Sequence, residues 1–170
     1  MNIKRIEKEH RKLTSIFNSG NSVLDKFIKS DNAFNSAQGI TYVWLNSEGS
    51  ELIGYYNISA GTFDWIDNKC RIKQCGAAHI NYFAVTEKYQ GVHYKEGDDD
   101  YKLSDLLLSD CLSRIETIRE SIGVGCITLS STEQGYNLYR RADFEELEDD
   151  ICFSDTSDEK KTIDMYLLLE

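Results

Sequence analysis

The stretch INYFAVTEKYQG, residues 80–91, carries the strongest signal for the fold. Residues 79–86 form an almost unbroken apolar run, which predicts a strand near the centre of a sheet. A polar turn then closes on Gln90 and Gly91, and residues 103–122 predict an amphipathic helix. A strand that ends beside a helix N-terminus directs backbone N–H groups at one point, so this stretch predicts a phosphate-binding site.

The rest of the chain predicts an alternation of strands and helices around this stretch. Residues 61–78 are less regular and predict a loop or a broken strand over a site. The order of elements indicates one α+β domain over residues 1–170, with helices packed on a single sheet. We expect strands at residues 2–7, 39–46, 52–60, 124–131, 143–148 and 162–170, and helices at residues 19–32 and 133–142.

The composition restricts the class of protein. The net charge of −10, from 19 basic and 29 acidic residues, disfavours nonspecific binding to nucleic acid or to anionic membranes. No apolar run approaches the roughly 20 residues of a membrane span, and the N-terminus lacks the apolar region of a signal peptide, so we expect a cytoplasmic protein. Local basic patches remain open at Lys4, Arg5, Lys8, Arg11 and Lys12, at Lys69, Arg71 and Lys73, and at Arg140 and Arg141.

The five cysteines do not form a metal-binding pattern. Their number is odd, no CxxC occurs, and Cys70 and Cys75 have no matching Cys or His pair elsewhere. We therefore expect reduced thiols and no metal site. Cys126 has no base beside it in the sequence, which argues against a nucleophilic role.

Two halves of the sequence together resemble the GNAT superfamily of acetyl-CoA-dependent N-acetyltransferases. Residues 80–91 match the family's strand and the beginning of its Q/R-x-x-G-x-G/A loop, and CITLSSTEQGYNLYRRADFEEL, residues 126–147, matches its second half. Two further stretches, FNSGNSVLDKFI at 17–28 and GYYNISAG at 54–61, resemble the toxin branch of toxin–antitoxin pairs. The resemblance implies a mixed, mostly antiparallel sheet with helices on both faces.

The resemblance also implies a set of site residues. The leaving thiolate of CoA would be protonated by Tyr139, and His79 stands where some relatives place a general base. Tyr55, Tyr56, Ser59, Trp65 and Tyr82 are open to both a core role and an acceptor-side role. The cofactor would be held by the backbone of Phe83, Ala84 and Val85, by Gln90 and Gly91, and by the start of the helix at Lys102, Leu103, Ser104 and Asp105.

Two departures from the family pattern concern the glycine loop and the turn after Tyr139. An acidic insertion of about ten residues, roughly Val92 to Tyr101, interrupts the loop after Gly91. Its carboxylates cannot all face a pyrophosphate, because like charges a few ångströms apart would cost several kcal/mol in a partly dry site, on the order of 332/(εr). We therefore expect a solvated loop that bulges away, with a turn at Gly97. Asp143 replaces the glycine that is usual after the second motif.

The expected function is transfer of an acetyl group from acetyl-CoA to a primary amine by direct attack. The toxin branch implies an aminoacyl-tRNA as the acceptor, which the net charge disfavours, and a protein or small-molecule amine is the competing acceptor. A non-catalytic binding module with a degraded cofactor loop is the alternative from another class. An antitoxin partner and a homodimer are further states that the sequence leaves open.

Overall fold

The computed structural model describes residues 1–66, 72–96, 99–147 and 162–169. Most elements begin and end close to the positions that the sequence predicts. The strands are β1 Asn2–Arg5, β2 Ile40–Leu45, β3 Leu52–Ile66, β4 Ile72–Val85, β5 His93–Glu96, β6 Asp99–Lys102, β7 Val124–Ser131, β8 Glu145–Glu146 and β9 Ile163–Leu168. The helices are α1 Arg11–Ser15, α2 Ser22–Lys29, α3 Leu103–Ile122 and α4 Tyr136–Arg141, with 3₁₀ turns η1 Lys8–His10, η2 Asp31–Phe34, η3 Ser36–Gln38 and η4 Glu87–Tyr89.

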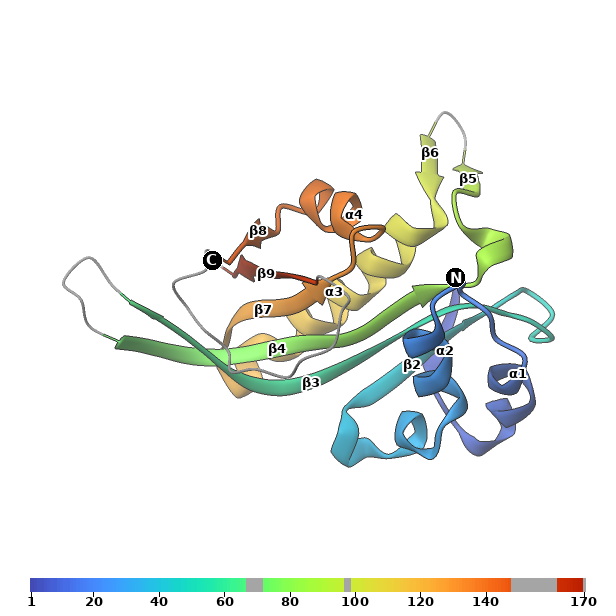
Figure 1. Ribbon diagram of the computed structural model, residues 1–170, viewed down its shortest axis with the longest axis horizontal. Helices are drawn as coiled ribbons and strands as arrows, with labels where there is room; N and C mark the ends of the chain where they lie inside the picture. Colours follow the sequence, from blue (N-terminus) through green and yellow to red (C-terminus); the bar gives the residue numbers. More distant parts are fainter. Residues whose placement is uncertain (67–71, 97–98, 148–161, 170) are drawn as a thin grey trace. The chain divides into compact units, whose positions relative to one another are not determined.

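Seven of the described strands form one sheet, in the order β1-β2-β3-β4-β7-β9-β8 (Figure 1). The pairs β1/β2, β2/β3, β7/β9 and β8/β9 are antiparallel, and β4/β7 is parallel. The predicted mixed, mostly antiparallel α+β sheet is therefore confirmed. Residues 61–78, for which a loop or a broken strand was predicted, are strand in their described part, because β3 continues to Ile66 and β4 begins at Ile72, so the loop alternative is wrong there. Polar residues obscured the strand pattern here, and β4 is further stabilised by pairing with the distant strand β7.

Two compact units are described separately here. The first unit comprises Met1–Ser59 and Asn81–Glu116, and the second comprises Ala60–Ile80 and Thr117–Glu170. Strands β3 and β4 pass through both units.

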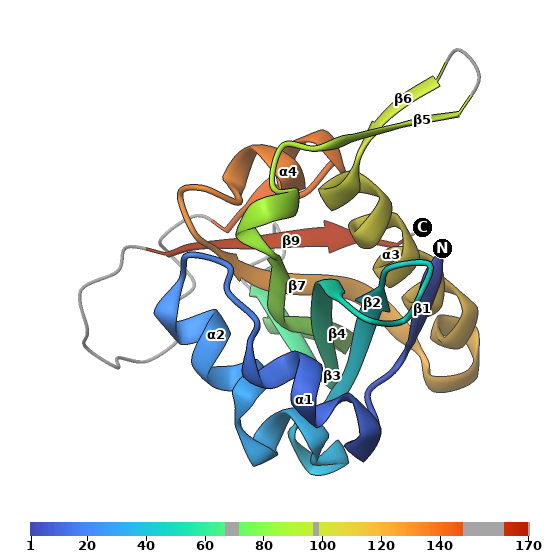
Figure 2. The same ribbon diagram turned by 90° about the vertical axis from the view of Figure 1, so that its right-hand side faces the viewer.

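Helices α1 and α2 of the first unit cover one face of its strands (Figure 2). Phe27 of α2 stacks on Tyr82 with 3.7 Å between ring centroids, and Tyr55 donates its hydroxyl to the carbonyl oxygen of Leu24 over 2.7 Å. Asn21 caps α2 by accepting from the N–H groups of Val23 and Leu24. The core of this face consists of Ile6, Phe17, Phe27, Ile28, Ala33, Val43, Leu45, Leu52, Tyr55 and Ala84.

The first part of α3 packs on strand residues that alternate with those of this core. The hydroxyl of Tyr56 donates to Asp110 over 2.5 Å, and Asp110 also accepts from Nε of Arg114 over 2.8 Å. Arg114 in turn lies over the ring of Tyr42, 4.4 Å from its centroid. Because successive strand residues point to opposite faces, helices cover both faces of these strands, as predicted. The hydrogen bond between Tyr56 and Asp110, and that between Asp110 and Arg114, explain why these two charged residues lie on the otherwise apolar face of α3.

The acidic insertion is a β-hairpin instead of the loop that was predicted. Tyr94 pairs with Tyr101 and His93 with Lys102 across β5 and β6. The hairpin extends away from the beginning of α3, and the helix starts at Leu103 as expected (Figures 1 and 2). The predicted turn residue, Gly97, lies outside the described residues. The alternation of polar and aromatic residues permits cross-strand pairing that the acidic composition concealed.

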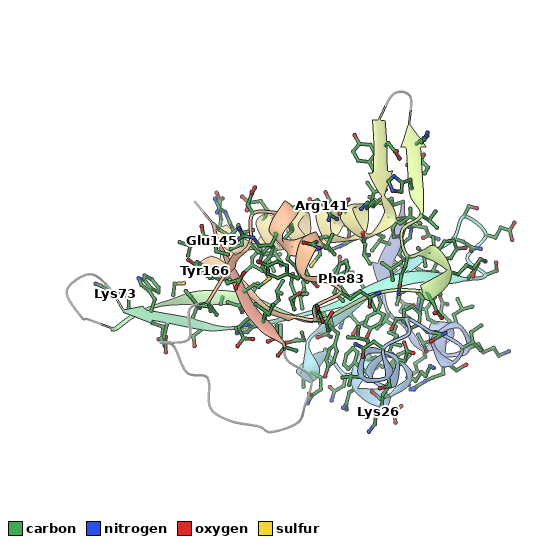
Figure 3. All side chains as sticks on the ribbon, turned by 45° about the horizontal axis from the view of Figure 1, so that its top comes forward. Lys26, Lys73, Phe83, Arg141, Glu145 and Tyr166 are labelled. Atoms are coloured by element: carbon green, nitrogen blue, oxygen red, sulfur yellow. The ribbon has the colours of Figure 1, made fainter. Side chains whose placement is uncertain are left out.

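The second unit has a small aromatic core beside β7 and β9. Phe63 stacks on Trp65 and on Tyr166, with centroid distances of 6.0 and 5.5 Å. The hydroxyl of Tyr166 donates to Glu145 over 2.7 Å, and Figure 3 shows these two side chains close together. Helix α3 ends at Gly123, whose φ of 67° is the left-handed conformation expected of a helix-ending glycine.

Candidate functional site

Gln90 holds the turn that follows β4. Its Nε2 donates to the carbonyl oxygen of Val85 over 3.0 Å and to the carbonyl oxygen of Ser19 over 2.8 Å. The side chain therefore ties the end of β4 to the segment before α2. In this arrangement Gln90 shapes the predicted phosphate loop through its own contacts within the chain.

Gly91 gives the turn its direction. It has a φ of 71°, and a Cβ on this residue would meet no atom within 4 Å. The chain next passes through the hairpin and returns at Leu103, whose N–H donates to the carbonyl oxygen of Val92 over 3.1 Å. The Leu103 N–H is thus engaged within the chain. Ser104 and Asp105 follow in the first turn of α3, where N–H groups have no carbonyl acceptor inside the helix.

The charges near this turn are partly paired. Asp100 of the hairpin lies 2.9 Å from Nδ1 of His93, so this carboxylate is engaged on the hairpin itself. Lys88 is also occupied, since its ammonium group lies 2.9 Å from Glu51. Lys102 is half-buried at the foot of the hairpin, next to the helix start. It is the cation best placed in sequence for an anion at the first turn of α3.

The predicted strand segment of the cofactor site lies at the end of β4. Ala84 and Val85 are buried, and Phe83 is half-buried. A Cβ on Gly54 of β3 would come within 2.8 Å of the carbonyl oxygen of Ala84 and 2.9 Å of Leu107. Glycine at this position therefore lets β3, β4 and α3 approach one another closely. The first unit thus brings together all of the predicted cofactor residues.

The two predicted catalytic residues both lie in the second unit. Tyr139 of α4 is 7% exposed, and its ring packs edge-to-face on Phe144 with 5.7 Å between centroids. Its ring also lies beside Gly135, where a Cβ would come within 3.3 Å of the tyrosine and 3.4 Å of Ser131. The ring is therefore fixed between α4 and the end of β7. A fixed hydroxyl donor is what protonation of a thiolate requires.

His79 is held more tightly than the sequence suggests. Its Nδ1 hydrogen-bonds the hydroxyl of Thr128, the neighbouring residue on β7. Its ring fills the space above Gly61, since a Cβ there would lie 2.0 Å from the ring nitrogen Nε2. Burial lowers the pKa of His79, so the imidazole is neutral near pH 7. A neutral imidazole can accept a proton, and the same contacts also serve packing.

Sequence reasoning missed a row of polar side chains in the first unit. Thr41, Asn57 and Asn81 come from β2, β3 and β4 and are joined by hydrogen bonds, with Ser59 beside Asn81. Each residue is ordinary in its own segment. In the sequence, each of these strands shows only an isolated polar residue. The pairing of the strands is what brings the three residues into hydrogen-bonding contact.

Most aromatic residues considered for the acceptor side belong to the core. Tyr55 and Tyr56 are both fully buried, Tyr82 stacks on Phe27, and Trp65 packs on Phe63. Only Ser59 of that set joins an exposed polar contact, with Asn81. These contacts support the core role for Tyr55 and Tyr56, and the acceptor-side role stays a prediction.

Three of the five cysteines lie in the part of the chain that the structure describes. Cys75, Cys111 and Cys126 are free thiols, and burial raises the pKa of Cys126 to about 12, which makes it a poor nucleophile at neutral pH. Cys70 and Cys152 lie outside the described residues. No group of three metal-ligating side chains occurs among the described residues. None of the helices described has the length and apolar character to cross a membrane.

Comparison with known proteins gives one curated relative and many structural neighbours. No protein-family model matches the sequence. The chain is 29% identical over 111 residues to a probable toxin TacT of Sinorhizobium fredii, a match that covers 61% of this chain. The match spans only about half of that relative, 56% of its length.

Solved structures of bacterial toxins resemble the chain. A variant of KacT has a TM-score of 0.75 at 14% identity, covering 98% of this chain and 94% of that one. AtaT bound to the C-terminus of the antitoxin AtaR and acetyl-CoA has a TM-score of 0.73 at 12% identity, covering 98% and 92%. AtaT complexed with acetyl-methionyl-tRNAfMet has a TM-score of 0.69 at 13% identity, covering 96% and 92%. The chain therefore has the fold of these toxins over almost its whole length, which includes both units.

Proposed function

We propose that this chain is an acetyl-CoA-dependent N-acetyltransferase of the toxin type, and that residues 1–170 act as one domain. One observation carries the proposal. In the first unit, β4 leads through the Gln90–Gly91 turn to the first turn of α3, and the insertion leaves this path as a hairpin. The solved complex of AtaT, which shares the fold, contains acetyl-CoA.

The reaction follows from these residues and the chemistry of a thioester. The amine nitrogen attacks the thioester carbonyl carbon, a C–N bond forms, and the C–S bond breaks. Tyr139 donates a proton to the departing thiolate, and the attacking nitrogen loses a proton to His79 or to water. Lys102 and the first turn of α3 stabilise the pyrophosphate. The backbone of Phe83, Ala84 and Val85 pairs with the acyl-bearing arm.

We further propose the α-amine of an aminoacyl-tRNA as the acceptor. The support is the complex of AtaT with acetyl-methionyl-tRNAfMet. Arg140 and Arg141 are adjacent cations of α4, and Arg140 donates to the uncharged carbonyl oxygen of Phe144 over 3.0 Å. Arg11 is less suited, because it lies 2.6 Å from Asp31. A protein or small-molecule amine is the competing acceptor, since the net charge of −10 weakens tRNA binding.

A non-catalytic module is the second candidate, and one contact favours it. The Leu103 N–H is hydrogen-bonded to Val92, so the helix start offers one N–H group fewer to a phosphate than an uninterrupted loop would. A module of this kind would keep the fold and lose the cofactor.

Binding and transfer of acetyl groups separate the candidates. Acetyl-CoA at millimolar concentration should raise the melting temperature, because it binds only the folded state. Radiolabelled acetyl-CoA with a fully aminoacylated tRNA pool should then yield labelled tRNA. The absence of a melting shift would identify the non-catalytic module, and a shift without tRNA labelling would direct the search to protein and small-molecule amines.

The same proposal extends to partners and compartment. The solved complex of AtaT with the C-terminus of AtaR makes an antitoxin the partner to test first, and a homodimer the second. Acetyl-CoA and charged tRNA are cytoplasmic, so we propose that the protein acts there. Co-expression with the neighbouring gene product tests the antitoxin, and sedimentation analysis tests the dimer.

A further inference from the structure

The row of polar side chains across β2, β3 and β4 begins in the interior of the first unit. Thr41 and Asn57 expose 1% and 0% of their surface, and Nδ2 of Asn57 donates to the Thr41 hydroxyl over 3.0 Å. A buried carboxamide destabilises the fold unless its polar atoms are hydrogen-bonded, and apolar residues would fill this position without that requirement. Gly39 leaves room for the carboxamide, since a Cβ there would lie 2.6 Å from Oδ1 of Asn57. The row ends at the surface with the exposed Asn81.

The hydrogen bonds fix how the Asn81 amide is turned. Asn57 uses its NH₂ group on Thr41, so its oxygen faces Asn81, whose Nδ2 donates to it over 2.8 Å. The same Nδ2 donates to the Ser59 hydroxyl over 2.9 Å, which uses both N–H bonds of the amide. Among the described residues, Oδ1 of Asn81 accepts one bond, a long one of 3.3 Å from Ser59. This oxygen therefore retains the capacity to accept a hydrogen bond from a ligand.

The position of Asn81 on β4 relates it to the proposed reaction. It precedes Phe83 by two residues, which corresponds to about 7 Å along a strand. The proposed phosphate site lies beyond the other end of this segment, after Val85, at Gly91 and the start of α3. An acyl-bearing arm that runs from there back along Val85, Ala84 and Phe83 brings its thioester toward Asn81.

We propose that Oδ1 of Asn81 binds the attacking amine of the acceptor and positions its nitrogen toward the thioester carbon. This inference rests on the acetyltransferase function proposed above and adds the subsite for the second substrate. The ligand class is a primary amine, which supplies the N–H donor that an amide oxygen recognises. An uncharged hydrogen-bond acceptor such as the Asn81 amide oxygen suits the reaction. A carboxylate at this place would favour the protonated form of the amine, which cannot attack.

The test compares steady-state constants for acetyl-CoA and for a fully aminoacylated tRNA pool. Asn81→Ala should raise the KM for tRNA by on the order of tenfold, the effect of losing one hydrogen bond to a charged or polar ligand. The KM for acetyl-CoA should stay unchanged, whereas the melting temperature should fall, because the buried oxygen of Asn57 loses the N–H group that donates to it. Asn46→Ala is the control, because it removes another hydrogen-bonded carboxamide, which binds Ser50 over 3.1 Å in the turn between β2 and β3.

Asn81→Asp separates positioning from a structural role. The variant keeps an acceptor oxygen and loses the two N–H donors, so the KM for tRNA should stay near that of the native protein. Its pH–rate profile should shift to higher pH by about one unit, because the carboxylate stabilises the ammonium form of the acceptor. A merely structural role predicts that the aspartate variant is as impaired as the alanine variant, with an unshifted profile.

Each result has one meaning. Native protein that acetylates the tRNA pool, with an unchanged tRNA KM in Asn81→Ala, overturns this inference and leaves the proposed function standing. Native protein that binds no acetyl-CoA, or that leaves the pool unmodified, overturns the proposed tRNA-acetylating function and this inference with it.

Discussion

The main-chain N–H of Leu103 donates a hydrogen bond to the carbonyl oxygen of Val92, with 3.1 Å between the two atoms. This contact closes the foot of the β5–β6 hairpin, so the inserted residues leave and rejoin the chain at one point. The insertion therefore lengthens the loop after Gly91 without displacing the start of α3. It also engages one N–H group of the predicted phosphate site.

Removal of the hairpin should strengthen cofactor binding. In a variant with two glycines in place of residues 92–101, the Leu103 N–H loses the carbonyl of Val92 as its partner and Lys102 remains beside the helix start. We expect the acetyl-CoA affinity to rise by up to about tenfold, the effect of one charge-assisted hydrogen bond. The melting temperature should change by only a few degrees, because an isolated two-stranded hairpin contributes little stability. Isothermal titration calorimetry and thermal denaturation measure the two quantities.

A charge-only variant is the control for this prediction. Replacement of Asp98, Asp99 and Asp100 by Asn removes three charges and keeps the Leu103 contact. Any gain in affinity should then disappear at high ionic strength, where exposed charges are screened. A gain of a hundredfold or more that survives high salt would contradict the hairpin geometry, since it would put these carboxylates at the phosphate.

Tyr139→Phe should separate catalysis from binding. The substitution keeps the ring that packs on Phe144 and removes the hydroxyl donor. Turnover should fall by roughly 10²–10⁴-fold while the acetyl-CoA affinity persists, because a general acid acts only during the reaction. Single-turnover acetylation and a binding titration give the two numbers.

Tyr136→Phe is the matched control, in the same helix. Its hydroxyl hydrogen-bonds Glu146, so the change removes a polar contact of similar size at a position with no proposed chemistry. Its turnover should equal that of the native protein. Equal turnover in both variants would make Tyr139 a packing residue.

Acidification should destabilise the protein through His79. Burial lowers the pKa of this histidine in the folded state, whereas the unfolded chain keeps the ordinary value of about 6.5. Below that value the unfolded state binds more protons, so the free energy of unfolding decreases as the pH falls through 6.5 toward the folded pKa. Above it the contribution is fully present. Melting temperatures measured from pH 8 to pH 5 should show this decrease.

His79→Gln should flatten that pH dependence. The residual slope reports the other buried histidine, His10, whose pKa burial also lowers. A slope identical to the native one would show that His79 does not titrate in this range. In the same variant, a pH–rate profile for acetyl transfer that matches the native profile would remove His79 as a base.

Asp143→Gly should stabilise the second unit. Asp143 has a φ of 62°, the left-handed region that costs side chains with a Cβ free energy and glycine almost none. The gain should be up to about 1 kcal/mol, partly offset by the greater freedom of glycine in the unfolded chain. Asp143→Ala should destabilise, because alanine lacks the polar side chain that makes this conformation tolerable for Asp. Chemical denaturation measures both, and a stabilised alanine variant would contradict the backbone assignment.

The sequence by itself determined the features that depend on local pattern. The 3.6-residue spacing of Leu103, Leu107, Cys111 and Ile115 predicted α3, and all four are buried on it. Gly123 follows Ile122, the last residue of that helix, with a φ of 67°, a conformation that glycine adopts readily. The apolar run before Val85 predicted β4, and the motifs at both ends of the chain predicted the fold that comparison with the solved toxins confirms. The predicted site residues rest on the same motifs and stay predictions.

Only the tertiary structure decided which residues meet across the strands. Strand β3 extends to Ile66 and β4 begins at Ile72, within a stretch whose sequence looked irregular. Hydrogen bonds to neighbouring strands stabilise a strand whatever its own pattern. His79 lies over Gly61, and Asn81 reaches Asn57, through pairings between residues far apart in the sequence. Val23 is an apolar residue of α2 and is 57% exposed, whereas Phe27 and Ile28 of the same helix are buried. The spacing of apolar residues in the sequence shows which face of a helix or strand is apolar. The neighbouring elements determine how much of that face is covered.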